Sequence, residues 1–93
     1  MLTHNTYFEG KVQSIGFERN GRKATAGVID VGEFRFNTGA PERMIVVSGE
    51  LFVKQAGEDA WRSYPTGTYF EIPGSSHFDV KATSPAAYVC EFL

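Results

Sequence analysis

The chain has 93 residues, of which 42% are apolar and 14% aromatic, and its formal charge at pH 7 is −2. It is too short for two ordinary domains and too apolar to be disordered, so we expect a single domain over residues 1–93. The weakly negative charge gives no electrostatic reason to expect a nucleic-acid partner. No apolar run is long enough for a membrane helix, and no secretion signal precedes the chain's first apolar segment, so we expect no membrane association. With a single cysteine, Cys90, these features predict a cytoplasmic protein without an internal disulfide.

Short segments of alternating apolar and polar residues, broken by turn residues, follow one another along the whole chain, which is typical of all-β proteins. In chain order we expect strands over residues 7–17, 23–31, 33–38, 42–47, 51–55, 61–64, 68–72, 77–82 and 87–93. The segment 42–47 is almost continuously apolar, so we expect it to be buried on both faces. Eight to ten short antiparallel strands must close or pack as two sheets, because open edges aggregate. The sequence therefore predicts a jelly roll or small β-barrel.

The Asn20-Gly21 pair predicts a tight type I′ hairpin turn, since both residues tolerate positive φ. The only short cluster of basic residues flanks this turn and consists of Arg19, Arg22 and Lys23. On residue type alone, these side chains indicate a solvated hairpin tip.

The two histidines, His4 and His77, are far apart in the sequence and have no CxxC or HxH motif beside them. Metal sites generally need three or four ligands, so we expect surface or hydrogen-bonded histidines. Cys90 alternates in phase with Tyr88 and Phe92, which predicts a buried and inert thiol. No serine elbow, dinucleotide-binding glycine motif or phosphate-binding loop is present.

Glu42 opens the most apolar strand and, by alternation, shares a face with Met44, Val46 and Ser48. A carboxylate on an apolar face is costly to bury without a partner. Two interpretations remain open at this point. Glu42 is either a strand-end residue that reaches solvent or pairs with an arginine, or a functional acid.

The spacing of several residues resembles the two motifs of the small cupins. Glu42 and Gly49 are separated by six residues, as in the first motif, and Gly67 and Pro73 by five, as in the second. In this register the three metal-binding histidines of the cupins are replaced by Phe36, Thr38 and Phe78. The resemblance thus argues against a metal site of the cupin type.

The whole chain resembles the small cupin-type pyrimidine/purine nucleoside phosphorylases of bacteria. The segments that carry the resemblance include Asn5-x-Tyr7-Phe8-x-Gly10-Lys11-Val12, Ser14-Ile15-Gly16-Phe17, Pro41-Glu42-x-Met44, Val47-Ser48-Gly49 and Tyr88-x-Cys90-x-x-Leu93. The resemblance implies an enzyme that converts a nucleoside and inorganic phosphate into a free base and ribose 1-phosphate. It also implies broad base tolerance and no metal or organic cofactor.

Phosphorolysis needs an acceptor for the ribose, a surface for the base and donors for phosphate. We assign the catalytic role to Glu42, which would bind ribose hydroxyls or stabilise developing positive charge. The substrate-binding candidates are aromatic residues for stacking and hydroxyls for phosphate: Phe36, Phe78, Phe17, Tyr7, Thr38 and Ser48. Plain core packing is the alternative for Phe36 and Phe78.

The cation that would face phosphate stays open, because alternation turns Arg35 and Arg43 away from the expected site. Arg22, Lys11 or a cation of a partner subunit are the remaining candidates. A surplus of aromatic residues and long strand edges predict a homodimer. The alternative function is a non-catalytic cupin, either a small-ligand-binding protein or a dimeric structural module. A metal-dependent cupin enzyme is disfavoured by the lost histidines.

Overall fold

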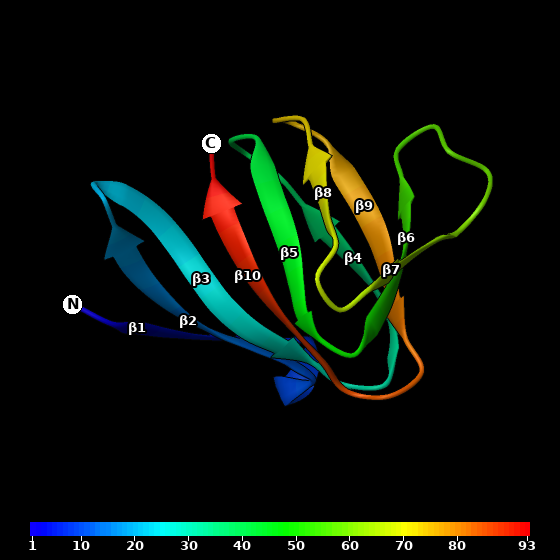
Figure 1. Cartoon of the computed structure of the whole chain (residues 1–93), viewed down its shortest axis with the longest axis horizontal. Coiled ribbons are helices and arrows are strands. Elements are labelled where there is room, and N and C mark those ends of the chain that lie inside the picture. Colours follow the sequence, from blue (N-terminus) through cyan, green and yellow to red (C-terminus); the bar gives the residue numbers. More distant parts are fainter.

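The computed structural model describes residues 1–93 as two antiparallel sheets that face each other (Figure 1). The six-stranded sheet has the order β1-β2-β3-β10-β5-β8, and the four-stranded sheet has the order β4-β9-β6-β7. The elements are β1 (Thr3–Tyr7), η1 (Phe8–Gly10), β2 (Val12–Arg19), β3 (Arg22–Ile29), β4 (Gly32–Asn37), β5 (Glu42–Ser48), β6 (Glu50–Gln55), β7 (Arg62–Pro65), β8 (Tyr69–Ile72), β9 (His77–Ala82) and β10 (Ala86–Phe92). The predicted all-β architecture is confirmed. No helix in the structure is long and apolar enough to cross a membrane.

The prediction of one strand over residues 7–17 is wrong, because these residues span the end of β1, the turn η1 and most of β2. The chain reverses in η1, so that β1 pairs with β2 from Tyr7 opposite Val12 to Thr3 opposite Gly16. Phe8 and Glu9 have φ angles of 53° and 57°, in the left-handed region. Non-glycine residues rarely adopt this conformation, so residue type alone does not predict a reversal there.

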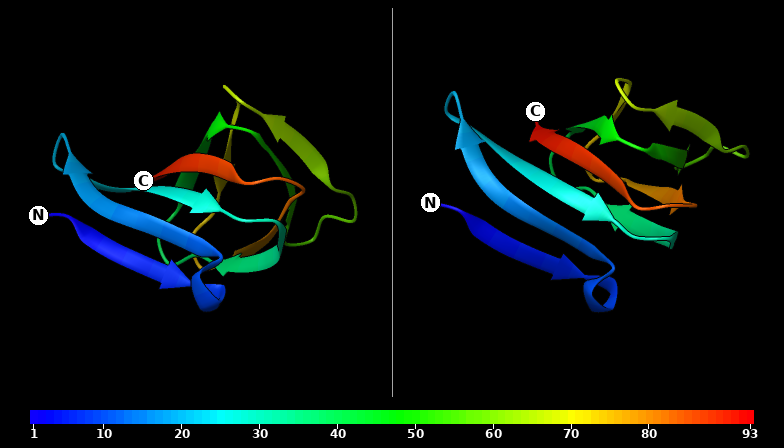
Figure 2. Two further views of the ribbon diagram at one scale, coloured as in Figure 1. Left: turned by 90° about the horizontal axis from the view of Figure 1, so that it is seen from below. Right: turned by 60° about the horizontal axis from the view of Figure 1, so that its bottom comes forward.

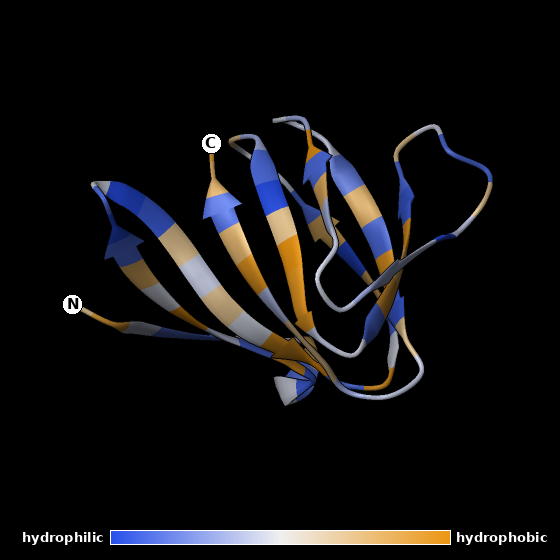
Figure 3. Ribbon diagram, in the orientation of Figure 1, coloured by the Kyte–Doolittle hydropathy of each residue, from blue (hydrophilic) through white to orange (hydrophobic).

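The core lies between the two sheets and is built by alternation along the strands (Figure 3). In β9, Phe78 and Val80 are fully buried, while His77, Asp79 and Lys81 point to the other face, as expected. Fifteen buried apolar residues form one continuous cluster. Burial of this apolar surface is the main force that holds the two sheets together.

β5 differs from its prediction, since only its inner face is buried. Met44 and Val46 are 1% and 0% exposed, but Val47 is 47% exposed. No further layer covers the outer face of the six-stranded sheet, where other large apolar side chains are also exposed, among them Ile15, Val28 and Tyr69. The β-branched residues of this segment therefore reflect strand propensity rather than burial on both sides.

The strands β1, β2 and β3 extend the six-stranded sheet beyond the smaller sheet (Figure 2). Their hairpin turns at Asn20 and Gly21, which have φ angles of 54° and 75°. Positive φ at both positions is the type I′ geometry that the sequence predicts. This extension leaves part of the inner sheet surface uncovered by the second sheet, and a cavity lies there.

Candidate functional site

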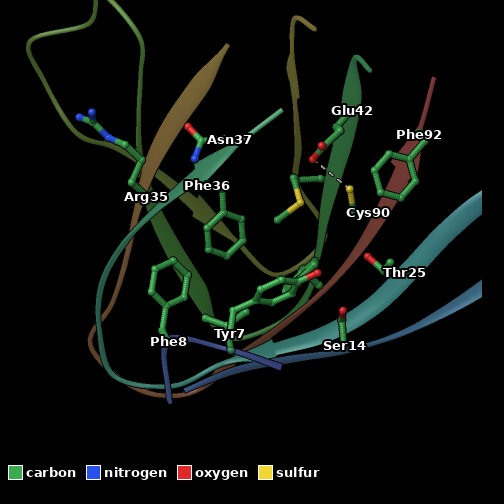
Figure 4. Close-up of a pocket in the computed structure, with 13 residues that line it drawn as sticks. Tyr7, Phe8, Ser14, Thr25, Arg35, Phe36, Asn37, Glu42, Cys90 and Phe92 are labelled. Atoms are coloured by element: carbon green, nitrogen blue, oxygen red, sulfur yellow. Dashed lines mark hydrogen bonds between the residues drawn. The ribbon is translucent and has the colours of Figure 1, made fainter. Parts of the chain in front are cut away.

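A cavity of about 360 Å³ opens between the inner face of the six-stranded sheet and the edge strand β4 (Figure 4). Its volume is within the range of small-molecule sites, about 300–1,000 Å³. The lining side chains come from β1, η1, β2, β3, β4, β5 and β10: Tyr7, Phe8, Val12, Ser14, Thr25, Arg35, Phe36, Asn37, Glu42, Met44, Tyr88, Cys90 and Phe92. Segments from both ends of the sequence thus meet in one site.

One wall of the cavity is polar, and strand register explains its composition. Cys90 lies opposite Thr25 of β3 and opposite Met44 of β5, so all three side chains point inward. Glu42, the first residue of β5, lies on the same face. Ser14 of β2 also points inward, because it is two positions from the buried Val12. The sheet therefore presents a carboxyl, a thiol and hydroxyl groups side by side.

The other wall is aromatic. Tyr7 and Phe8 come from the β1–η1 segment and Phe36 from β4, whereas Phe92 lies on β10 as the register partner of Glu42. The rings of Phe8 and Phe36 are nearly parallel, with centroids 6.1 Å apart and an interplanar angle of 12°. An apolar wall opposite a polar one suits a ligand with a flat ring at one end and hydroxyl groups at the other.

Glu42 is the only acidic residue of the cavity, and its carboxyl is half-buried. Its Oε1 accepts a hydrogen bond from the Cys90 thiol at 3.3 Å (Figure 4). Burial raises the pKa of Glu42, and the thiol hydrogen bond partly opposes this rise. None of the chain's ion pairs includes Glu42, so pairing with an arginine does not explain its position. The role of Glu42 as a functional acid stays a prediction.

Tyr88 and Cys90 form the buried part of the polar wall. Burial raises the pKa of Tyr88 to about 12, and the neighbouring Ser14 hydroxyl lowers it in part. Burial and the neighbouring Glu42 carboxylate also raise the pKa of Cys90, which keeps the thiol protonated as a donor. The Tyr88 ring packs directly over Gly27, where an added Cβ would lie 2.6 Å from the ring. Gly27 thus makes room for this wall.

Three of the residues expected at the site meet in the cavity: Glu42, Phe36 and Tyr7. Phe78 lies behind Phe36, with ring centroids 5.2 Å apart, and is fully buried. Its position agrees with the alternative of core packing. Phe36 is half-buried between this core and the cavity.

The other three expected residues lie outside the cavity. The Thr38 hydroxyl donates to the Pro73 carbonyl at 2.8 Å and accepts from the Ser76 amide at 2.9 Å, so it holds a loop. Phe17 is paired with Ala24 on the outer face of the six-stranded sheet. Ser48 is exposed at the end of β5 that is farthest from Glu42.

The only nitrogen-bearing side chains of the cavity are Arg35 and Asn37, at its rim. Arg35 is directed away from the centre of the cavity (Figure 4) and pairs with Asp79 at 2.8 Å. The expectation that Arg35 faces outward is confirmed. The His4 ring lies 3.1 Å from the Gln13 side chain, and no three His, Cys, Asp or Glu residues come together where they could hold a metal ion.

Sequence reasoning missed most of the lining residues. The alternation of β10 already places Tyr88, Cys90 and Phe92 on the face of Glu42, so a register between β5 and β10 would have found them. No comparable signal exists for Phe8, because its place depends on the left-handed backbone of η1.

Comparison with known proteins agrees with this architecture. Residues 2–92 match the family described as pyrimidine/purine nucleoside phosphorylase. The chain belongs to this family. Two relatives named pyrimidine/purine nucleoside phosphorylase come from Sorangium cellulosum, at 63% identity over all of both chains, and from Anaeromyxobacter sp., at 66% identity over all of this chain and 89% of the relative. The expectation of an enzyme of the pyrimidine/purine nucleoside phosphorylase family is confirmed.

Solved structures of this fold include a protein of unknown function from Vibrio parahaemolyticus. It has a TM-score of 0.98 and 43% identity, and the match covers 100% of this chain and 99% of that one. A cupin superfamily protein from Desulfitobacterium hafniense matches with a TM-score of 0.74 at 10% identity, over 96% of this chain and 83% of that one. The phosphorylase family therefore shares the cupin fold.

Proposed function

We propose that this protein catalyses the reversible phosphorolysis of purine and pyrimidine nucleosides to a free base and α-D-ribose 1-phosphate. One observation carries the proposal: Glu42 stands without a cationic partner in a cavity whose opposite wall is aromatic. Family membership gives the reaction class, and this cavity supplies matching chemistry. The ribose would lie against the polar wall and the base against the rings.

In the proposed step, the C1′–N bond breaks and its electron pair leaves with the base, which takes up a proton in exchange for the one that phosphate loses. A phosphate oxygen forms the new C1′–O bond from the other side of the sugar. Positive charge develops on the ribose ring as the base departs. The Glu42 carboxylate would stabilise this charge while it accepts a hydrogen bond from a ribose hydroxyl. The Cys90 thiol already occupies Oε1, which leaves Oε2 for the sugar.

Broad base tolerance is part of the proposal and is supported by the composition of the aromatic wall. Stacking on Phe36, Phe8 or Tyr7 accepts any base, because every base has an apolar face. Strict selection would need buried donors and acceptors that match one base edge. The aromatic wall offers a single hydroxyl, that of the half-exposed Tyr7.

We also propose that inorganic phosphate is the only co-substrate and that no metal takes part. The residues at the three cupin ligand positions, Phe36, Thr38 and Phe78, cannot bind a metal through nitrogen. Phosphate would approach beside Asn37 and Arg35, whose side chains carry the nitrogen donors of the cavity. Arg35 would have to turn from Asp79 to reach it, which costs little for an exposed ion pair.

Two further expectations belong to this proposal. The chain would act as a homodimer, because β1 is a free strand edge and the outer face of the six-stranded sheet exposes apolar side chains. Sedimentation velocity at micromolar concentration measures this, and a monomer would contradict it. The reaction would run in the cytoplasm, in agreement with a single buried thiol.

The test is an assay with purified protein, phosphate and either uridine or adenosine, in which free base is measured. Both nucleosides should yield base, the rate should depend on phosphate, and treatment with a chelator should leave it unchanged. The Glu42→Gln variant should fold normally and lose at least about 100-fold in kcat/KM, about 2.7 kcal/mol of transition-state stabilisation.

Absence of base release with several nucleosides would overturn the proposal. If nucleosides then still raised the melting temperature, the result would favour the alternative of a non-catalytic small-ligand-binding cupin. Full activity of Glu42→Gln would remove the catalytic role of Glu42.

A further inference from the structure

A second hollow, of about 300 Å³, lies on the molecule at the tip of the β2–β3 hairpin and the nearby ends of β5 and β10. We call it the basic hollow, and its lining residues are Arg19, Asn20, Arg22, Lys23, Ala24, Arg43, Glu91 and Leu93. It contains four of the nine lysine and arginine residues of the chain and one acidic side chain. In a chain of net charge −2, this is a local concentration of positive charge.

The two arginines of the hairpin tip have no ion-pair partner within the chain. Arg43 is held by two ion pairs, to Glu71 at 2.7 Å and to Glu91 at 3.6 Å. Arg19, Arg22 and Lys23 take part in none of the chain's ion pairs. The basic hollow thus joins one oriented guanidinium to two arginines outside any ion pair and to Lys23, whose register partner is Glu18.

The register of the hairpin adds an independent observation. Arg19 and Arg22 are directly opposite each other in the β2–β3 ladder, on either side of the Asn20-Gly21 turn. Like charges in this position destabilise a hairpin, whereas an acidic residue at either position would stabilise it. Departures from such local rules are expected at functional sites. An anion held between the two guanidinium groups would turn their repulsion into attraction.

The basic hollow is separate from the cavity of Glu42. Ala24, Arg43 and Glu91 are register partners across β3, β10 and β5, and they point to the outer face of the sheet. Their chain neighbours Thr25 and Glu42 line the cavity on the inner face. The two sites therefore lie back to back at the same end of the six-stranded sheet. An anion in the basic hollow cannot be the phosphate that attacks C1′.

We propose that the basic hollow binds a small phosphorylated anion that carries two or more phosphoryl groups. Guanidinium groups bind phosphoryl oxygens in pairs through parallel N–H donors, and several of them converge here. The hollow has the volume of a small-molecule site rather than the length of a nucleic-acid groove. Ala24, a small residue that is 6% exposed, is also part of its lining. This inference does not depend on the proposed phosphorylase activity.

Inorganic tripolyphosphate is the probe for a test by calorimetry and by NMR of backbone amides at constant ionic strength. The intact protein should bind it saturably, with amide shifts at residues 19–24 and 43 rather than at Phe8 and Phe36 of the cavity. The Arg22→Glu variant should lose at least tenfold in affinity. Its melting temperature without the anion should nevertheless rise, because the substitution places opposite charges across the ladder.

Two further variants serve as controls for the loss of affinity in Arg22→Glu. Arg22→Gln removes the charge without adding a new one and should also lose affinity. Arg62→Ala removes an exposed arginine of β7 that pairs with Glu58, and it should bind like the intact protein. No saturable binding, shifts confined to the cavity, or equal affinity of Arg22→Glu and the intact protein would each overturn the proposal. Replacing tripolyphosphate by orthophosphate should weaken binding; an equal response would contradict the requirement for several phosphoryl groups.

Discussion

The thiol of Cys90 donates a hydrogen bond to Oε1 of Glu42 across a distance of 3.3 Å, although the two residues are 48 positions apart in the chain. The contact exists because β5 and β10 are neighbours, with Cys90 opposite Met44 and Glu42 opposite Phe92. Cys90 is 4% exposed, so water does not compete for this bond. The thiol thus fixes one oxygen of the proposed catalytic acid and favours its charged form.

Removal of this donor should move the pH dependence of the reaction. In Cys90→Ala, Glu42 loses a hydrogen bond that lowers its pKa, so its pKa rises further. If the carboxylate is the active form, the acidic limb of kcat/KM moves to higher pH. Cys90→Ser keeps a hydrogen-bond donor to Glu42 and should leave the acidic limb at its original pH. The pH profiles of kcat/KM for all three proteins, measured from base release, check this prediction. If the acidic limbs of the alanine variant and the intact protein coincided, the positioning role of Cys90 would be refuted.

Glu42 should also affect stability in a pH-dependent manner. Its pKa is raised in the folded chain, so the folded state binds more protons than the unfolded state between the two pKa values. The free energy of unfolding should therefore fall as pH rises from the ordinary glutamate range through the raised pKa. Glu42→Gln removes this contribution to the pH dependence of the free energy of unfolding. Urea unfolding at a series of pH values should show that the variant becomes more stable relative to the intact protein as pH rises. If the two free energies of unfolding changed in parallel with pH, the result would contradict the burial of this carboxyl.

Alternation along the strands predicted the fold and the face of Glu42, but not which inward residues reach the cavity. Phe36 and Phe78 both point inward, yet Phe78 is covered by neighbouring rings and only Phe36 borders the opening. Depth of burial depends on tertiary packing, which no single strand encodes. In a continuous strand over residues 7–17, Tyr7 and Phe17 would share a face. The reversal in η1 places them on opposite faces instead.

Gly27 should be essential to the polar wall, because the Tyr88 ring occupies the space of its missing side chain. Gly27→Ala would push the buried ring toward the cavity, and overpacking of this kind costs about 1–3 kcal/mol. We expect reduced stability in urea and a higher KM. The same substitution at Gly57, where no atom lies within 4 Å of an added Cβ but φ is +83°, is a control for backbone strain alone. It should leave KM unchanged.

The aromatic wall should bind all bases in the same manner. Phe36→Leu keeps an apolar side chain against the core but removes the ring, and loss of a stacked ring is worth about 1–3 kcal/mol per base. The value of kcat/KM should fall by roughly the same factor for uridine and adenosine, about tenfold for 1.4 kcal/mol. Kinetics with both nucleosides measure this. A loss confined to one of them would show that Phe36 selects a base rather than providing a common surface.

Variants of Thr38 distinguish a structural role of its hydroxyl from a role in substrate binding. Its hydroxyl joins the Pro73 carbonyl and the Ser76 amide, so Thr38→Val leaves two backbone groups without partners. The expected loss is about 1–3 kcal/mol of stability, with kcat/KM for phosphate nearly unchanged, because Thr38 lies outside the cavity. Thr38→Ser retains the hydroxyl and should restore most of the stability. Urea unfolding and phosphate kinetics on both variants decide the question. A raised KM for phosphate in Thr38→Val at intact stability would instead return Thr38 to the phosphate site that the cupin register indicates.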